Sequence, residues 1–146
     1  MNRGTITAVA LAAVLVPVAT APAVSAVPAA AGYVDARVRG CAGEGPGCRP
    51  GVVVHRWHKR GAGTRGVGWV YASRESVRSG TARWLVRKPG GAWKVGGRWK
   101  RAVSTGGSFV EATWGKDGHT GPKYPKGSRI CVEYRGLAAK ACATLK

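Results

Sequence analysis

Apolar and polar residues alternate in short runs along most of this chain, and Gly, Pro, Ser or Asp residues interrupt each run. Alternation with period two is clear in 67–71 and 82–86, whereas no stretch carries an apolar stripe of period 3.6. The pattern predicts an all-β fold, a small antiparallel β-sandwich-like domain, with strands at 52–58, 67–73, 81–88, 92–95, 98–103, 108–114, 129–135 and 139–145. We expect turns at 89–91 (Pro-Gly-Gly) and at 96–97 (Gly-Gly) between neighbouring strands.

The last two predicted strands have a register that can be derived residue by residue. If Cys131 faces Cys142, then Glu133 faces Lys140, which is a favourable cross-strand pair. The same register places one apolar face on the hairpin, with 130, 132 and 134 opposite 143, 141 and 139. The loop is then Gly136-Leu137, and Gly at the first loop position is typical of a type II′ turn.

The first 26 residues read as a secretory signal peptide rather than as part of the fold. A basic start with Arg3 precedes the apolar run 6–19, and small residues follow up to Ala26, after which we expect cleavage. A second cleavage site follows Ala31. The apolar run is short for a bilayer and contains Pro17, so a membrane anchor is not favoured. We therefore expect a secreted, extracellular protein with a flexible N-terminal arm at 27–40 and a disulfide-stapled β domain at 41–146.

The four cysteines of a secreted chain are expected to form disulfides. Among the three connectivities that four cysteines allow, sequential pairing is preferred. Cys41 and Cys48 enclose a turn-forming hexapeptide, and Cys131 and Cys142 lie on the two strands of the last hairpin. The clustered spacing of a zinc site is absent, and we expect no metal and no cofactor.

The formal charge of +18, from 24 Lys and Arg against 6 Asp and Glu, points to an anionic partner. Cations and aromatic residues are interleaved, and the candidate binding residues of this kind are Trp93, Arg98, Trp99, Lys100 and Arg101. Such a surface suits phosphate backbones, cell-wall polymers, acidic protein faces and anionic lipids. The alternative is that the cations only keep the protein soluble and protect strand edges. A specific nucleic-acid target is not expected.

The residues offer no convincing catalytic set, and we expect that the protein is not an enzyme. His55 and His58 are three apart, so on a strand they point to opposite faces. His119 lies in a turn-rich loop with no partner that the sequence identifies. The best enzymatic alternative is a small basic nuclease that uses a His with a Glu as general acid and base.

The arm at 27–40 is a second candidate binding element. Tyr33, Val34 and Val38 could become buried on binding, and Arg37 and Arg39 suit an acidic pocket in a partner. The alternative is a disordered leader with no role.

Three features together resemble small secreted β-proteins of actinomycetes. They are Trp114, the run from Tyr124-Pro125 through Gly127 to Ile130-Cys131-Val132 and Tyr134, and the closing Ala141-Cys142-Ala143. Within that group the chain is similar to the adaptor subunit of the secreted umbrella toxin particles. The resemblance implies a small β-protein that joins a lectin-bearing, trypsin-like subunit to a large toxin subunit. It carries no catalytic residues.

The function expected from the sequence is a secreted, non-enzymatic adaptor in an extracellular antibacterial toxin complex. The alternatives are a free cationic antimicrobial or cell-wall-binding protein, and a secreted protease inhibitor.

Overall fold

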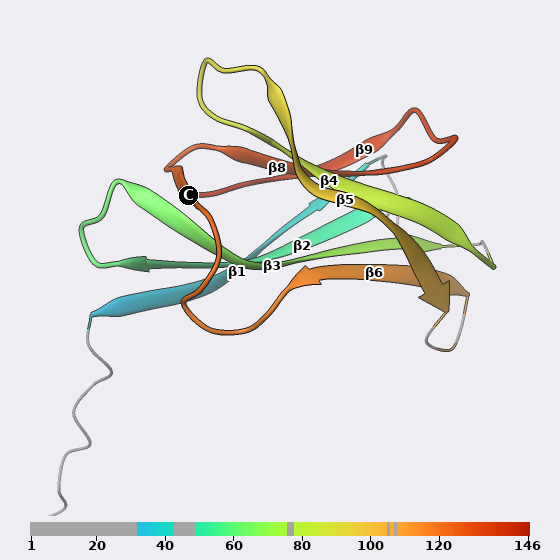
Figure 1. The fold of residues 1–146 in the computed structure, drawn as a ribbon, viewed down its shortest axis with the longest axis horizontal. Coiled ribbons are helices and arrows are strands. Elements are labelled where there is room, and N and C mark those ends of the chain that lie inside the picture. Colours follow the sequence, from blue (N-terminus) through green and yellow to red (C-terminus); the bar gives the residue numbers. More distant parts are fainter. Residues whose placement is uncertain (1–31, 43–48, 76–77, 105, 107) are drawn as a thin grey trace, which may run out of the picture.

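A computed structural model of the chain describes residues 32–42, 49–75, 78–104, 106 and 108–146. These residues contain nine strands and no helix, which confirms the predicted all-β class. The strands are β1 Tyr33–Cys41, β2 Gly51–Lys59, β3 Thr64–Glu75, β4 Gly80–Arg87, β5 Trp93–Ser104, β6 Phe109–Gly115, β7 Lys123–Pro125, β8 Arg129–Tyr134 and β9 Lys140–Thr144 (Figure 1).

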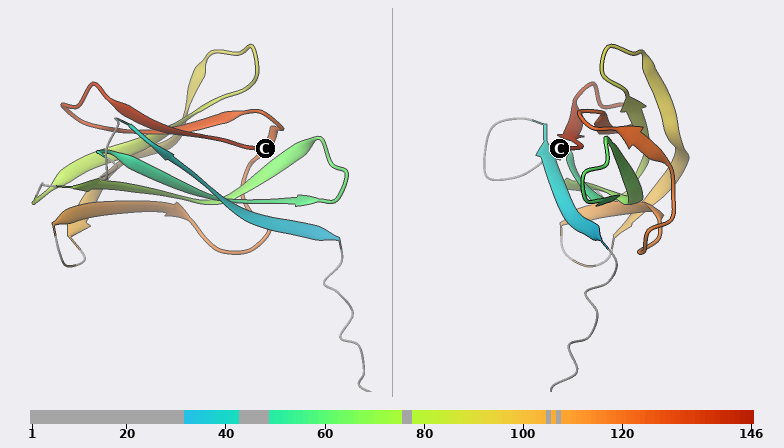
Figure 2. Two further views of the ribbon diagram at one scale, coloured as in Figure 1. Left: turned by 180° about the vertical axis from the view of Figure 1, so that it is seen from behind. Right: turned by 90° about the vertical axis from the view of Figure 1, so that its left-hand side faces the viewer.

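All the strand pairs are antiparallel, and the hydrogen-bonded order is β1-β2-β3-β6-β5-β4-β8-β9, with β7 added to β3. The long strand β5 pairs with β4 along most of its length and with β6 at its last two residues. It therefore carries the sheet around a bend, and the end-on view in Figure 2 shows the strands gathered around a common interior. The predicted sandwich is thus better described as one antiparallel sheet that is nearly barrel-shaped.

The barrel nearly closes where β9 lies beside β1, although no hydrogen-bonded ladder joins these two strands in the described part of the chain. Gly40 of β1 packs directly against the backbone of β9. A Cβ atom at this position would lie 1.9 Å from the carbonyl oxygen of Cys142. Only glycine allows such an approach, so the contact between the two strands depends on Gly40.

The interior is filled by alternate residues of the strands, as the period-two pattern requires. On β4 the inward residues are Ala82, Trp84 and Val86, and on β8 they are Ile130, Val132 and Tyr134. Every one of these side chains is buried. The remaining core is mostly valine and alanine, contributed by Val52, Val54, Val67, Val70, Ala72, Ala102, Val110, Ala112, Ala141, Ala143 and Leu145.

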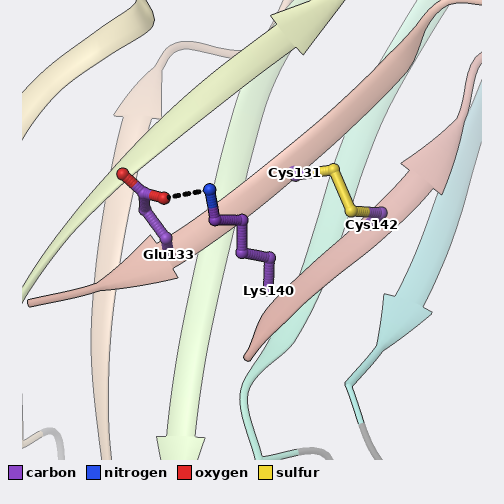
Figure 3. Close-up of a disulfide and its surroundings, with 4 residues drawn as sticks. All are labelled: Cys131, Glu133, Lys140 and Cys142. Carbon is purple, nitrogen blue, oxygen red and sulfur yellow. Dashed lines mark ion pairs between the residues drawn. A yellow bond between two sulfur atoms is a disulfide. The ribbon is translucent and has the colours of Figure 1, made fainter. Parts of the chain in front are cut away.

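The β8–β9 hairpin has the register predicted from the sequence. Cys131 is paired with Cys142 and forms a disulfide with it, and Glu133 is paired with Lys140 (Figure 3). The loop is longer than predicted, because β8 ends at Tyr134 and β9 begins at Lys140. The amide of Leu137 donates to the carbonyl of Tyr134, so Gly136, with φ of +75°, is the third residue of this turn and not the first.

The Gly96-Gly97 turn was predicted wrongly, whereas the turn after β4 is confirmed. At the latter, the amide of Gly91 donates to the carbonyl of Lys88. Gly96 and Gly97 instead lie inside the continuous strand β5, at a register irregularity opposite Trp84. Cβ atoms at these two positions would lie 2.1 and 2.2 Å from the Trp84 side chain. The two glycines therefore make room for a core tryptophan.

Part of the predicted flexible arm is a regular strand. Tyr33–Cys41 forms β1 and pairs with β2 over its whole length, from Tyr33 opposite Lys59 to Cys41 opposite Gly51. The arm prediction is therefore corrected from Tyr33 onward. The predicted signal peptide, both cleavage sites and Cys48 lie outside the described residues, so the Cys41–Cys48 pair stays a prediction.

Candidate functional site on the outer surface of the barrel

The outer side of β1 carries polar and aromatic residues that the sheet register aligns with residues of β2 and β3. Asp35 lies opposite Trp57, and Arg37 lies opposite His55, which in turn lies opposite Trp69. Paired residues of adjacent strands point to the same side of a sheet. Of the predicted binding residues of the arm, Tyr33, Arg37 and Arg39 are therefore part of a larger outer surface and not of a free peptide.

Asp35 is the centre of a cluster that joins β1, β2 and the segment between β6 and β7. His55 Nε2 donates to Asp35 Oδ1 at 3.0 Å, and His119 Nε2 donates to Asp35 Oδ2, also at 3.0 Å. The hydrogen bond from His119 lowers the pKa of the Asp35 carboxyl below its ordinary value and outweighs partial desolvation, which acts in the opposite direction. The hydrogen bond from His55 adds to the lowering. We call these three residues the Asp35 cluster.

Aromatic rings hold both histidines of the Asp35 cluster in place. His119 stacks on Tyr33 with ring centroids 4.1 Å apart, and His55 stacks on Trp69 at 5.7 Å. The indole N–H of Trp69 donates to Asp117 Oδ1 at 2.6 Å, which fixes the same segment that carries His119. The cluster therefore ties together three parts of the chain that are distant in sequence.

The contacts of the Asp35 cluster involve one nitrogen of each imidazole. Both histidines direct Nε2 at one carboxylate, so any proton exchange with a ligand would have to use Nδ1. The other ring nitrogen of His55, Nδ1, is buried without a hydrogen-bond partner. As predicted, His58 is separate from His55: its Nδ1 accepts a hydrogen bond from Arg56 at 3.1 Å. The described residues contain no group of three or more His, Cys, Asp or Glu suited to a metal ion.

A second surface lies on the outer side of β4, β5 and the end of β8, where arginines stack on exposed tryptophans. The guanidinium groups of Arg83 and Arg135 lie 4.6 and 5.2 Å from the ring centre of Trp99. Farther along β5, Arg87 lies 4.9 Å from the ring of Trp93. We call these five residues the arginine–tryptophan stripe.

Apolar side chains on β5 extend the stripe. Trp93 and Trp99 are 39% and 37% exposed, and Val95 and Val103 of the same strand are 56% and 53% exposed. Trp93 and Trp99 are therefore accessible to a partner. A row of exposed apolar groups on one strand, bordered by arginines, is typical of a surface that contacts another molecule.

A half-buried ion-pair network fixes one end of the arginine–tryptophan stripe. Glu133 is only 10% exposed at its side chain and accepts hydrogen bonds from Arg83 at 2.5 Å and from Lys140 at 2.8 Å. Burial acts to raise the pKa of Glu133, but the hydrogen bonds from Lys140 and Arg83 outweigh it, so the pKa is lowered. Arg83 is thereby held over Trp99 before any partner binds.

The structure separates the binding residues that the sequence grouped together on β5. Arg101 is exposed, like Trp93 and Trp99. Lys100 is tied back, because its ammonium donates to the carbonyl of Thr113 at 2.7 Å. The carbonyl of Arg98 accepts the indole N–H of Trp114 at 3.0 Å.

The N-terminal candidates divide by strand alternation. Tyr33 stacks on His119, and Arg37 lies 5.6 Å from the ring centre of Trp69, both on the outer surface. Arg39 is exposed on the same strand. Val34 and Val38 are half-buried, and Val38 packs against the core.

The sequence did not indicate Asp35, Arg87 or Arg135 as site residues, and it associated Arg83 with the adjacent Trp84 and not with Trp99. The predicted turn at 89–91 already places Arg87 opposite Trp93, which is the register of the structure, so the sequence held a signal for this pair. No sequence pattern near His119 or near Asp35 indicates that these two side chains meet.

No helix long and apolar enough to cross a membrane occurs in the part of the chain that the structure describes. Comparison of the chain with protein-family models, with curated proteins and with solved structures finds no match.

Proposed function

We propose that this chain is a secreted, non-enzymatic adaptor that binds an acidic protein surface through the arginine–tryptophan stripe. The assembly would be an extracellular antibacterial toxin complex, as the resemblance to umbrella-particle adaptors implies. The observation that carries the proposal is the stacking of Arg83 and Arg135 on exposed Trp99.

The stacked arrangement suits a partner that presents carboxylates. An arginine on an aromatic ring keeps its N–H donors available at its edge, and it can bind a carboxylate with two parallel hydrogen bonds. Tryptophan and arginine are also the residues that contribute most to binding energy in protein interfaces. The surplus of 24 basic over 6 acidic residues adds a long-range attraction for an acidic partner.

A second group of exposed cations supports an adaptor with two contact surfaces. Arg37 and Arg39 lie on β1, at one end of the strand order, whereas the stripe lies on β4, β5 and β8. A protein that joins two subunits needs two such surfaces. The Asp35 cluster fixes the strand that carries Arg37 and Arg39.

The experiment compares two variants that each lose two positive charges. Arg87→Gln with Arg135→Gln alters the stripe, and Arg60→Gln with Lys126→Gln, two exposed cations away from it, is the matched control. Each full-length chain is expressed in the producing bacterium and isolated from culture fluid by an affinity tag. The particle mass is measured by native mass spectrometry.

We expect the wild-type chain and the control to be recovered in a large complex of fixed stoichiometry, and the stripe variant as a monomer. Raising the salt concentration should release the wild-type chain, because exposed charge pairs are screened. A monomeric wild-type chain that inhibits bacterial growth alone would instead identify a cationic antimicrobial. Stoichiometric titration of trypsin would identify a protease inhibitor, and RNA hydrolysis would identify a nuclease.

A further inference from the structure

Strand β5 has a free edge over most of its length. From Trp93 to Arg101, its hydrogen-bonded neighbour among the described residues is β4 alone. Strand β6 joins β5 only at Val103 and Ser104. The turn end of the β4–β5 hairpin also extends beyond the rest of the sheet (Figures 1 and 2). On the side away from β4, this stretch of β5 therefore offers main-chain donors and acceptors to another strand.

Side chains bridge β5 and β6 where the two strands diverge. The indole of Trp114 donates to the carbonyl of Arg98 at 3.0 Å, and the ammonium of Lys100 donates to the carbonyl of Thr113 at 2.7 Å. In a continuous ladder these carbonyls would accept main-chain amides. A hollow of about 330 Å³, lined by residues of both strands, lies beyond these contacts. Strand β6 therefore leaves the edge of β5 open toward the hairpin turn.

Strand alternation gives the free edge one basic side and one apolar side. Lys94 lies opposite the core residue Val86, so it is on the side of β5 that corresponds to the barrel interior, and it is nevertheless exposed. Lys100, opposite a core alanine of β4, is on the same side and is also exposed. Trp93 and Val95 point to the other side and are 39% and 56% exposed. A strand beside β5 would therefore meet lysines on one side and apolar groups on the other.

The charges of β5 determine which chain can pair with this edge. The strand contains no acidic residue and four basic residues, which are Lys94, Arg98, Lys100 and Arg101. These cations oppose pairing with a second copy of the protein, because the edge of that copy carries the same charges. The same cations attract a strand that presents carboxylates on the side of Lys94 and apolar side chains on the side of Val95.

We propose that the free edge of β5 binds an extended segment of the acidic partner as an additional strand, in which acidic and apolar residues alternate. This inference rests on the proposed function, because it specifies how the acidic partner is held. Main-chain hydrogen bonds supply the affinity of such a contact, and the alternating side chains supply its specificity. The arginine–tryptophan stripe includes Trp93 and Trp99 of β5, so the same partner contacts the stripe and the edge.

The test uses the peptide acetyl-Glu-Val-Glu-Val-Glu-Val-Glu-amide as a probe of the full-length secreted chain. Two further versions of the peptide carry N-methyl groups, one on every valine and the other on every glutamate. Amides of alternate residues in an extended peptide point to the same edge, so each version blocks one edge and keeps all the charges. Dissociation constants are measured by isothermal titration calorimetry.

We expect saturable binding of the unmethylated peptide, at least tenfold weaker binding of one methylated version, and little change for the other. The reason is that an added strand uses one of its two edges, whereas attraction by charge alone does not depend on methylation. Equal effects of the two methylated versions, or no binding of the unmethylated peptide, would overturn the proposal.

A pair of protein variants and an NMR measurement locate the added strand. Lys94→Gln should weaken binding of the unmethylated peptide about two- to fivefold, whereas Lys126→Gln, which removes an exposed cation outside β5, should have no effect. Bound peptide should slow amide exchange in β5. Equal effects of the two variants, or slower exchange in β1 or β9 instead, would show that the peptide does not add to β5.

The results separate this inference from the proposed function. If the toxin complex forms and depends on Arg87 and Arg135, while methylation has equal effects, the adaptor function stands and strand addition is wrong. If one edge of the peptide is required, while the wild-type chain is a monomer in culture fluid, strand addition stands and the adaptor function is wrong.

Discussion

Glu133 offers the most direct test of how this barrel is held together on the outer side of β8. Its carboxylate is nearly buried and accepts hydrogen bonds from Arg83 and from Lys140. Figure 3 shows the pair that it forms with Lys140. Replacement of Glu133 by Gln keeps the shape of the side chain and removes the charge. Arg83 and Lys140 then lose the carboxylate that both of them contact, while Arg83 stays over Trp99.

The expected loss of stability follows from the burial of each partner. A hydrogen bond to a charged group contributes about 1.5–3 kcal/mol when its partners are buried. The side chains of Arg83 and Lys140 are 31% and 45% exposed, so water replaces much of what they lose. We therefore expect Glu133→Gln to lower the free energy of unfolding by about 1–2 kcal/mol. The corresponding fall in Tm is roughly 4–10 °C for a domain of this size.

The difference in unfolding free energy between the wild-type chain and Glu133→Gln should depend on pH, and the pKa of Glu133 gives the sign of this dependence. The pKa of Glu133 is lowered in the folded state from its ordinary value of 4.5, so its ionised form stabilises the fold. That contribution is fully present above pH 4.5 and is lost as pH falls through the lower folded-state pKa. In urea unfolding at a series of pH values, the free energy of unfolding of the wild-type chain should exceed that of Glu133→Gln by a constant amount between pH 7 and about pH 5.5. This excess should shrink below about pH 4.5.

The matched control is Glu75→Gln. Glu75 pairs with Arg49 at 3.5 Å, and both side chains are well exposed, so this variant should lose less than about 0.5 kcal/mol. Two results would refute the account of a buried carboxylate held by two cations. One is an equal loss of unfolding free energy in both glutamate variants. The other is a difference between wild type and Glu133→Gln that persists unchanged to pH 3.

Three further predictions concern the disulfide, the glycines of β5 and the Asp35 cluster. Replacing both Cys131 and Cys142 by Ala should lower the free energy of unfolding by about 3 kcal/mol in urea titrations, because their sequence separation of 11 residues closes a short loop in the unfolded chain. An unchanged midpoint would contradict this. Gly97→Ala should cost about 1–3 kcal/mol through its clash with Trp84, with a shift in tryptophan fluorescence, whereas the open position Gly63→Ala should leave the spectrum unaltered. Asp35→Asn should speed amide exchange in β1 at pH 6. Because the pKa of Asp35 is lowered, the difference from wild type should fade as pH drops below the ordinary value of 3.8, and equal exchange at pH 6 would show that the cluster does not hold the strand.

The β8–β9 hairpin could be predicted because several of its signals are local. Cys131 with Cys142 and Glu133 with Lys140 both require the same register, and the alternation of apolar residues agrees with it. A shift by one residue would have reversed every side chain, so the pattern excluded the neighbouring registers.

Gly96-Gly97 shows where local patterns mislead. A Gly-Gly pair between two short apolar runs has the composition of a hairpin turn, yet here it lies within β5. The reason is the indole of Trp84, a residue of the neighbouring strand, which occupies the space that side chains at 96 and 97 would fill. Such a requirement depends on tertiary packing, which composition does not reveal.

The strand β1 and the Asp35 cluster could be predicted only in part. The alternation at Tyr33, Asp35 and Arg37 was visible in the sequence, but few apolar residues accompanied it, so the segment was expected to be flexible. Its order comes from pairing with β2 and from His119, which is 84 residues distant from Asp35. A loop histidine and a strand carboxylate at that distance share no local signal.

The contact between β1 and β9 through Gly40 has a consequence for the kinetics of folding and opening. The two strands lie at opposite ends of the described part of the chain and meet there without a hydrogen-bonded ladder, so their association has the highest loop-closure cost in the barrel. We expect this seam to form last during folding and to open first in the native state, at a free energy below that of global unfolding. Hydrogen exchange under native conditions should therefore detect an opened form in which β1 and β9 have separated while the pairs between them are intact. In that form the two strand edges could accept a strand from another chain, which makes the seam the place where domain exchange between copies would begin.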